Sequence, residues 1–319
     1  MSNEYKSHYS VMKDDVLEHF ENRSGLYADL TFGAGGHSLA LSKIPGAQVL
    51  SFDQDPDALK NGYQLIKDNN IDNITLIDSN FENFEEHADQ FLKTHNSEGF
   101  IGALMDLGVS SHHFDEAIRG FSFRHEAPLD MRMNPRSGQS VAEILNEFDE
   151  EDIANIIWEY GEEKLSRKIA RVIVHERKVA PIETTTKLAE LVRGCYPAAK
   201  RFGKIHPATK TFQALRIAVN RELDVLSDTL PRVAKKLVMN GRFAVISFHS
   251  LEDRLAKVIF KDFESREELP LYKTSKKPIL PSPREIFENS RSRSAKMRLL
   301  ERIPYKREKN KYAHLANKE

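Results

Sequence analysis

Short apolar runs alternate with amphipathic helical patterns over the first 110 residues of the chain. The runs are bounded by turn residues and are too short for typical helices, which indicates buried strands. Strands that alternate with helices at this spacing predict an α/β fold with a parallel, doubly wound sheet. The first strand is expected to begin near residue 27, the other strands to cover 47–52, 73–77 and 100–105, and the helices to cover 10–20, 57–67 and 82–95.

The rhythm changes after residue 110, where most segments as far as residue 240 have a helical pattern. Leu165, Ile169 and Ile173, for example, recur at the spacing of one helical face. The segment 171–174 contains consecutive β-branched residues and could instead form a strand. We therefore expect a largely helical unit inserted into the α/β domain.

The sheet is expected to resume towards the C-terminus. Residues 242–248 predict a buried strand, and residues 297–303 are expected to belong to a C-terminal hairpin. Residues 264–295 are rich in proline, serine and charge, which predicts a long loop. The predicted domains are a discontinuous α/β domain of residues 1–110 and 212–319, and a helical insertion of residues 111–211.

A glycine-rich turn follows the first predicted strand. Gly33, Gly35 and Gly36 allow positive φ angles and close approach of a ligand, at the rim where α/β proteins bind nucleotide-like ligands. The dinucleotide fingerprint G-x-G-x-x-G is incomplete, because Ser38 stands at its last position. A turn without the third glycine favours S-adenosylmethionine (SAM), which has no pyrophosphate, over NAD.

Acidic or aromatic side chains follow three of the predicted strands. Asp53 is placed to accept hydrogen bonds from ribose hydroxyls, whereas Asp55, directly before Pro56, is expected to cap the next helix. Phe81 could pack against an adenine ring or belong to the core. Asp106 could orient an amine or accept its proton, or it could cap a loop.

The last apolar strand of the parallel sheet is followed by a second group of polar residues. Ser250 and Asp253 have the spacing of a capping box, with Asp in place of Glu. His249 is not needed for this cap and is therefore a candidate for catalysis. His112 and His113 lack further ligands at fixed spacing, so we expect no metal site.

Composition argues against several classes of protein. Cys195 is the only cysteine, so no intrachain disulfide can form and a reducing, cytoplasmic location is expected. The first 15 residues are polar and do not resemble a signal peptide, and no apolar run approaches the length of a membrane span. We expect no membrane contact, and the sequence leaves open whether the chain is a monomer or a dimer.

The net charge of −1 hides an uneven distribution. Residues 1–110 contain 7 Lys and Arg against 18 Asp and Glu, so the rest of the chain is basic. Residues 191–221 contain no acid, and Tyr196, Phe202 and Phe212 are interleaved with their basic side chains. Such a segment suits phosphate contacts and base stacking, although a basic run is usually a solvated face. The candidate RNA contacts are Lys200, Arg201, Lys204, Lys210 and Arg216.

Five segments spread over nearly the whole chain carry a resemblance to a known family. They are residues 31–37 (Thr-Phe-Gly-Ala-Gly-Gly-His), 106–111 (Asp-Leu-Gly-Val-Ser-Ser), 119–123 with 128–133, 206–213 and 247–254. Together they resemble the RsmH (MraW) family, which methylates a cytosine amine in 16S ribosomal RNA. The resemblance implies a Rossmann-like, SAM-dependent rRNA (cytosine-N4)-methyltransferase with a helical insertion, acting on the small ribosomal subunit.

The resemblance also implies roles for individual residues. It places SAM contacts on Gly35, Gly36, His37, Asp53, Phe81 and Asp106, and a further contact on His113, where the family usually has glutamine. Asp106 is the first candidate for orienting the amine, and His249 is the second. Two alternatives are an NAD-dependent oxidoreductase, disfavoured by the incomplete fingerprint, and a non-catalytic RNA-binding module, disfavoured by the intact Gly-Gly-His turn.

Overall fold

The computed structural model describes residues 10–109, 117–203 and 205–305. These residues include a seven-stranded sheet in which the strands lie in the order β3-β2-β1-β4-β5-β7-β6. Neighbouring strands from β3 to β5 are parallel, whereas β7 is antiparallel to both β5 and β6. The predicted parallel sheet and the predicted C-terminal strand, β7, are therefore confirmed. Its antiparallel pairing with β6 is not a tight hairpin, because the segment between the two strands contains a helix. The strands are β1 Gly25–Asp29, β2 Ala47–Asp53, β3 Ile74–Asp78, β4 Phe100–Asp106, β5 Leu237–Ser247, β6 Leu271–Thr274 and β7 Lys296–Ile303.

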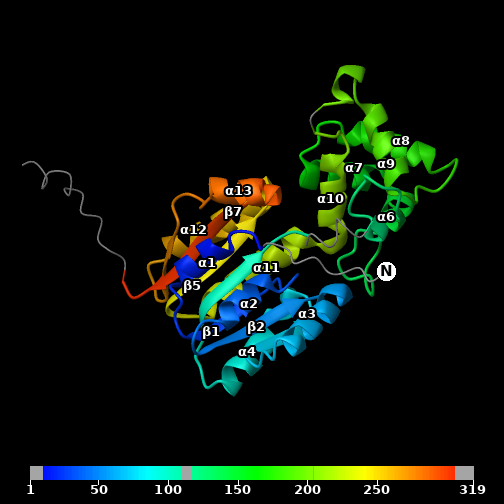
Figure 1. The fold of residues 1–319 in the computed structure, drawn as a ribbon. Coiled ribbons are helices and arrows are strands. Elements are labelled where there is room, and N and C mark those ends of the chain that lie inside the picture. Colours follow the sequence, from blue (N-terminus) through cyan, green and yellow to red (C-terminus); the bar gives the residue numbers. More distant parts are fainter. Residues whose placement is uncertain (1–9, 110–116, 204, 306–319) are drawn as a thin grey trace, which may run out of the picture.

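Helices cover both faces of this sheet (Figure 1). They are α1 Lys13–Phe20, α2 Gly36–Ser42, α3 Pro56–Asp68, α4 Phe84–Thr94, α11 Glu222–Lys235, α12 Ser250–Ser265 and α13 Pro283–Glu288. Successive strand residues point to opposite faces, so Ala28 belongs to the core beneath α4, α11 and α12, and Tyr27 to the core beneath α1 and α2. Burial on both faces explains why the strands are continuous apolar runs.

A second group of helices stands to one side of the sheet (Figure 1, green). These are α6 Val141–Glu147, α7 Glu150–Gly161, α8 Ser166–Glu176, α9 Thr185–Cys195 and α10 Thr209–Asn220. They enclose a hydrophobic core of their own, which includes Ile153, Leu188 and the single cysteine, Cys195. No helix in the described ranges is both long and apolar enough to cross a membrane.

Residues 171–174 lie within α8, so the strand alternative for this segment is wrong. Ile169 and Ile173, one helical turn apart, are both buried in the helical core. Packing of this apolar face against the neighbouring helices outweighs the local preference of β-branched residues for strands.

The long loop predicted for residues 264–295 is also wrong, because it contains β6 and α13. The start of α13 has a local signal: Ser282 accepts a hydrogen bond from the Glu285 N–H at 3.1 Å, and Pro283 occupies the first helical turn. Strand β6 has only four residues, too few for an apolar period to show.

The junction of α10 and α11 connects the two cores. Phe212 of α10 belongs to the helical core, whereas Leu226 of α11 belongs to the sheet core. Arg221, between the two helices, has a φ of 50° and turns the chain. The packing of Phe212 and Leu226 in different cores favours a domain boundary at Arg221 over the predicted boundary between residues 211 and 212. The division into two domains stays a prediction.

The loop of residues 119–133 is held in place by partly buried polar contacts. Arg119 Nη2 donates to the carbonyl oxygen of Met133 at 2.9 Å, and the Met133 N–H donates to Oδ1 of Asn220 at 2.7 Å. Asn220 is the last residue of α10. The loop is therefore held at its ends and against the junction of the two helices.

Replacement of Gly120 tests how tightly this loop is packed. Gly120 has a φ of 76°, and an added Cβ would lie 2.2 Å from the carbonyl oxygen of Pro128. We expect Gly120→Ala to lower the free energy of unfolding by about 2–4 kcal/mol, because the costs of overpacking and of left-handed backbone add.

The matched control is Gly194→Ala in α9, where an added Cβ meets no atom within 4 Å. This change should leave stability unaltered or raise it by at most about 1 kcal/mol. Denaturant unfolding followed by circular dichroism measures both variants. Equal stabilities would contradict the close packing at Gly120.

Candidate active site

The carboxyl ends of the parallel strands open into a cavity of about 980 Å³. The strand order places the ends of β2, β1, β4 and β5 next to one another, so residues far apart in the sequence line it. The opposite wall comes from residues 121–125 and from the junction of α10 and α11. The volume is at the upper end of the range for small-molecule sites.

Two glycines of the turn after β1, Gly35 and Gly36, leave no room for a side chain. Gly35 caps α2 with a φ of 78°, and a Cβ there would lie 2.7 Å from the ring of Phe32. At Gly36 a Cβ would lie 1.9 Å from Oγ of Ser10. Because Gly33 and Gly36 also line the cavity, the backbone of the turn borders it directly.

Asp53, at the end of β2, links this turn to the start of α3. Its Oδ2 accepts the Gly33 N–H at 2.7 Å, and its Oδ1 accepts the Asp55 N–H at 2.9 Å. Burial raises the pKa of Asp53 to about 6, although both bonds act in the opposite direction. Each carboxylate oxygen can accept a further bond. The ribose contact of Asp53, which lines the cavity, stays a prediction.

Asp55 is the N-cap of α3, as predicted. Its Oδ1 accepts the Asp57 N–H at 3.1 Å, and Pro56 stands in the first helical turn. Arg119 Nη1 also lies 3.1 and 3.2 Å from the two carboxylate oxygens. Asp55 therefore has two structural roles, as a helix cap and as the anchor of the loop of residues 119–133.

Phe81 combines the two roles considered for it. It begins a short 3₁₀ helix, Phe81–Asn83, directly before α4. Its side chain packs partly against the sheet core and also borders the cavity. The ring can therefore contact a ligand without leaving the core, and its contact with adenine stays a prediction.

Asp106, at the end of β4, lies at the centre of the rim. Its backbone N–H donates to Thr31 Oγ1 at 2.7 Å, which ties it to the glycine-rich turn. Its Oδ2 lies 3.4 Å from Nε2 of His37. Its Oδ1 is buried and has no hydrogen-bond partner among the described residues. The carboxylate therefore keeps acceptor capacity beside the cavity.

His37 lies between two carboxylates beneath the turn. Burial lowers the pKa of His37, but Asp106 and Asp29 outweigh burial, and the net shift is upward. Asp29 is fully buried and accepts a hydrogen bond from the Ser38 hydroxyl at 2.6 Å. Burial raises the pKa of Asp29 to about 6. His37 thus supports the Asp106 carboxylate, and its contact with SAM stays a prediction.

The capping box predicted from Ser250 and Asp253 is wrong by one residue. His249 is the N-cap of α12, and its Nδ1 accepts the Glu252 N–H at 3.4 Å. Glu252 Oε2 in turn accepts the His249 N–H at 3.2 Å, which completes the box with glutamate at its usual position. Asp253 instead pairs with Arg298, at 2.6 Å.

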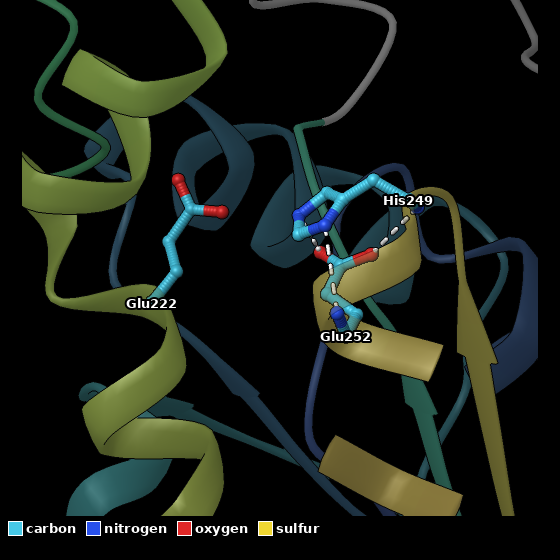
Figure 2. Close-up of side chains that lie close together, drawn as sticks. All are labelled: Glu222, His249 and Glu252. Atoms are coloured by element: carbon cyan, nitrogen blue, oxygen red, sulfur yellow. Dashed lines mark hydrogen bonds and ion pairs between the residues drawn. The ribbon is translucent and has the colours of Figure 1, made fainter. Parts of the chain in front are cut away.

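His249 is therefore held in the protein rather than free. Figure 2 shows its ring between the carboxylates of Glu222 and Glu252. Nε2 lies 3.0 Å from Glu252 Oε1 without the alignment of a hydrogen bond. Burial works against ionisation of Glu252, but His249, Arg216 and the Phe248 N–H together outweigh it and hold the pKa of that carboxyl below its usual value. Glu252 lines the cavity, together with Glu222.

Glu222, at the start of α11, is a cavity residue that the sequence analysis missed. Arg216 binds it through two parallel bonds, Nε to Oε1 at 2.9 Å and Nη2 to Oε2 at 2.8 Å. The two side chains are only 14% and 11% exposed, so Arg216 is part of a buried pair and not of an open basic surface. A glutamate directly after the acid-free segment 191–221 was the available signal.

Glu222, His249 and Glu252 together could hold a metal ion by distance alone. Their ligand atoms lie within 4.8 Å of one another (Figure 2). Arg216, however, already places a positive charge on both oxygens of Glu222. A guanidinium at this position opposes a second cation by like-charge repulsion, so the geometry favours an internal ion-pair cluster.

Three of the remaining candidates for RNA contact, Lys200, Arg201 and Lys210, lie on the helical unit. Lys200 ends a short 3₁₀ helix, and Arg201 donates to the carbonyl oxygen of Tyr196 at 2.9 Å. Lys210 Nζ donates to the carbonyl oxygen of Glu162 at 3.0 Å. Lys204 and His113 fall outside the described residues. Their RNA and cofactor contacts stay predictions.

The three aromatic residues of this segment have different surroundings. Phe202 is 84% exposed, and the guanidinium of Arg193 lies 5.9 Å from its ring centroid. Phe212 is buried in the helical core, and the Tyr196 hydroxyl is bonded to Glu163. Phe202 is therefore the one of the three that is open to stacking by a base.

A family model described as the MraW methylase family matches residues 5–303. The chain belongs to this family. Relatives named "Ribosomal RNA small subunit methyltransferase H" include one from Synechococcus elongatus, 46% identical, covering 93% of this chain and 95% of its own. Another, from Brevibacillus brevis, is 44% identical, and the match covers 93% of this chain and 98% of the relative. The solved structure of an rRNA methylase from Streptococcus thermophilus is 12% identical, with a TM-score of 0.42. The match covers 91% of this chain and 93% of that one.

The MraW family resemblance inferred from five segments is thus confirmed, and the chain is a methyltransferase. Every one of the five segments contributes to the same cavity. The lining residues include Thr31 and His37, Asp106, Phe123, Thr209 and Glu252, in the order of the segments. Membership in a methylase family removes the NAD-dependent alternative.

The pKa of Asp53 predicts how this methyltransferase depends on pH. A carboxylate accepts two ribose hydroxyl bonds only when it is ionised, and Asp53 takes up a proton at about pH 6. We expect SAM affinity to be constant above about pH 7 and to fall, by up to tenfold per pH unit, as the pH drops below 6.

Isothermal titration calorimetry between pH 5 and 8 measures this dependence. Asp53→Asn is the control, because it keeps the shape of the side chain and removes the titration. The variant should bind SAM more weakly and without the pH dependence. If the dependence persists in the variant, another group such as Asp29 is its source.

Proposed function

We propose that this enzyme transfers a methyl group from SAM to the exocyclic N4 amine of a cytosine in 16S rRNA of the small ribosomal subunit, in the cytoplasm. The observation that carries the proposal is the meeting of all five family segments at one cavity. The names of the relatives supply the class of substrate. The cavity supplies a place for both the cofactor and a single flipped base.

The strand order suggests how SAM lies in the cavity. Asp53 and Phe81 border the side of β2 and β3, where the ribose and adenine would bind. The glycine-rich turn of β1 comes next, followed by Asp106 on β4. An extended cofactor that crosses these ends in order brings its sulfonium, and the methyl group on it, towards Asp106.

The chemistry requires positioning more than acid or base strength. The lone pair of the cytosine amine is delocalised into the ring, so the amine is a poor nucleophile. Methyl transfer forms the N–CH₃ bond, breaks the S–CH₃ bond and releases one proton from nitrogen. Alignment of the amine with the sulfonium supplies most of the rate. The Asp106 carboxylate, supported by His37, is placed to accept an N–H bond and to orient the amine.

His249 has an indirect role in this proposal. Its ring nitrogens are engaged with Glu252, and it is Glu252 that lines the cavity. His249 therefore acts as a positioning residue for the wall at the end of β5. Asp106 remains the residue proposed to contact the amine.

RNA binding is proposed for the exposed edge of the helical unit. Lys200 and Arg201 directly precede the exposed Phe202 in the chain, and Lys210 lies at the start of α10. Cations beside an exposed aromatic ring combine phosphate contacts with base stacking. Arg216 is not part of this surface in the proposal, because Glu222 neutralises it.

The activity can be tested with SAM and small ribosomal subunits that lack the modification. Nucleoside mass spectrometry should detect one methyl group on the exocyclic amine of a cytosine. Asp106→Ala should lower kcat at saturating SAM by about 10²-fold or more, the loss typical of removing an acid–base or orienting group. Methyl on a ring carbon or on ribose, or a fully active Asp106→Ala variant, would falsify the mechanism.

The RNA surface is tested by charge reversal. Lys200→Glu with Arg201→Glu should weaken RNA binding, leave SAM binding unchanged and reduce the salt slope by about 0.7 for each lost contact to single-stranded RNA. Lys273→Glu, at an exposed position of β6, is the matched control. An unchanged salt slope in the double variant means that these residues form only a solvated surface.

A further inference from the structure

The wall of the cavity beyond β4 is not used by the proposed binding of SAM. It is formed by the end of β5, the start of α12 and the junction of α10 and α11. Arg216, Asn220 and Glu222 line it from the helical side, and Glu252 lines it from the sheet side. A base that reacts at Asp106 must lie between SAM and this wall.

Among the contacts of the described residues, the Arg216–Glu222 pair keeps unused hydrogen-bonding capacity on this wall. A guanidinium has five N–H donors, and two of them bind Glu222. A carboxylate has about four acceptor positions, of which Arg216 occupies two. Both side chains border the cavity, so an acceptor and several donors lie side by side in a largely desolvated setting.

This arrangement is complementary to one edge of cytosine. The Watson–Crick edge of cytosine presents an amine donor at N4 next to acceptors at N3 and O2. Uracil presents an acceptor at O4 next to a donor at N3, which is the reverse pattern. A carboxylate beside a guanidinium offers an acceptor for the N4 amine of cytosine and, next to it, donors for N3 and O2.

We propose that Glu222 and Arg216 bind the Watson–Crick edge of the target base and select cytosine against uracil. The inference rests on the proposed function, since it concerns the base that receives the methyl group. Glu222 accepts the N4–H next to N3, and Arg216 donates to N3 or O2. Asp106 is left to face the other N4–H, on the C5 side of the ring.

Two other uses of this wall fit the contacts less well. A metal ion held by Glu222, His249 and Glu252 would lie against the guanidinium of Arg216. A backbone phosphate would be repelled by the Glu222 carboxylate, which lies beside the guanidinium. A neutral base with donors and acceptors on one edge avoids both conflicts.

The surrounding contacts hold the pair in place before a base enters. Asn220 donates to the carbonyl oxygens of Met131 and Arg216, at 2.8 and 2.9 Å, and so fixes the end of α10. Arg221 then turns the chain, so that Glu222 begins α11 beside Arg216. Groups that are ordered in advance make a stricter filter than groups that must be ordered by the substrate.

The test compares cytosine with uracil at the position that mass spectrometry identifies as the methylated one. Small subunits with uracil at this position serve as competitors of the methylation of unmodified subunits. For the wild-type enzyme, the inhibition constant of uracil-bearing subunits should be about 10- to 100-fold higher than the dissociation constant of cytosine-bearing subunits. This is the discrimination expected of a good bidentate contact with a base.

The informative variant is the neutral pair, Arg216→Gln with Glu222→Gln. It leaves no lone charge buried, which a single replacement would do. We expect the preference for cytosine to fall to within about threefold and kcat/KM to fall at least tenfold, with SAM affinity unchanged as evidence of folding. Glu301→Gln, which weakens a half-buried pair with Arg242 in the middle of β5, is the matched control and should keep the preference.

The outcomes separate this inference from the proposed function. If the wild-type enzyme places no methyl group on cytosine, the proposed function fails. If it methylates cytosine but the neutral pair keeps the full preference, the function stands and the Arg216–Glu222 inference is overturned. Loss of the wild-type preference in the presence of a chelator would also overturn it, in favour of a metal ion at Glu222, His249 and Glu252.

Discussion

The burial of carboxylates at the carboxyl edge of the sheet is the constraint on which the rest of the site depends. Asp29 is fully buried there and Asp53 partly, and burial raises the pKa of each to about 6. Backbone N–H groups and the Ser38 hydroxyl replace only part of the lost hydration. Because β2, β1 and β4 are parallel neighbours, the sheet concentrates at one edge the negative charge that suits a cationic sulfonium.

The opposite wall balances its charges within the protein. Glu252 is buried there and Glu222 largely so, but Arg216 binds Glu222 and His249 lies against Glu252. This wall is therefore ordered without a ligand, whereas the edge with Asp53 and Asp106 keeps acceptor capacity that a ligand can use. The division fits a site in which one part receives a charged cofactor and another part recognises a neutral base.

Local sequence patterns predicted those features that local interactions decide. Asp53, Asp55 and Asp106 each follow an apolar strand closely, so their place at the rim could be predicted from the strand positions alone. The Arg216–Glu222 pair could not, because it depends on a left-handed residue between two helices. His249 was missed as a helix cap because imidazole is an uncommon capping group, and the basic pattern of residues 191–221 hid the burial of Arg216.

The two carboxylates proposed to contact the amine also have a consequence for the product. Cytosine N4 has two hydrogens, one facing Glu222 and the other facing Asp106 in the proposed arrangement. Methylation replaces one of them, so only one carboxylate can keep its bond. The other carboxylate then faces a methyl group and no longer accepts a hydrogen bond from N4, although it is largely shielded from water. This costs about 1–3 kcal/mol. The contacts that hold the substrate amine in line with SAM therefore bind the methylated product less tightly, which favours its release.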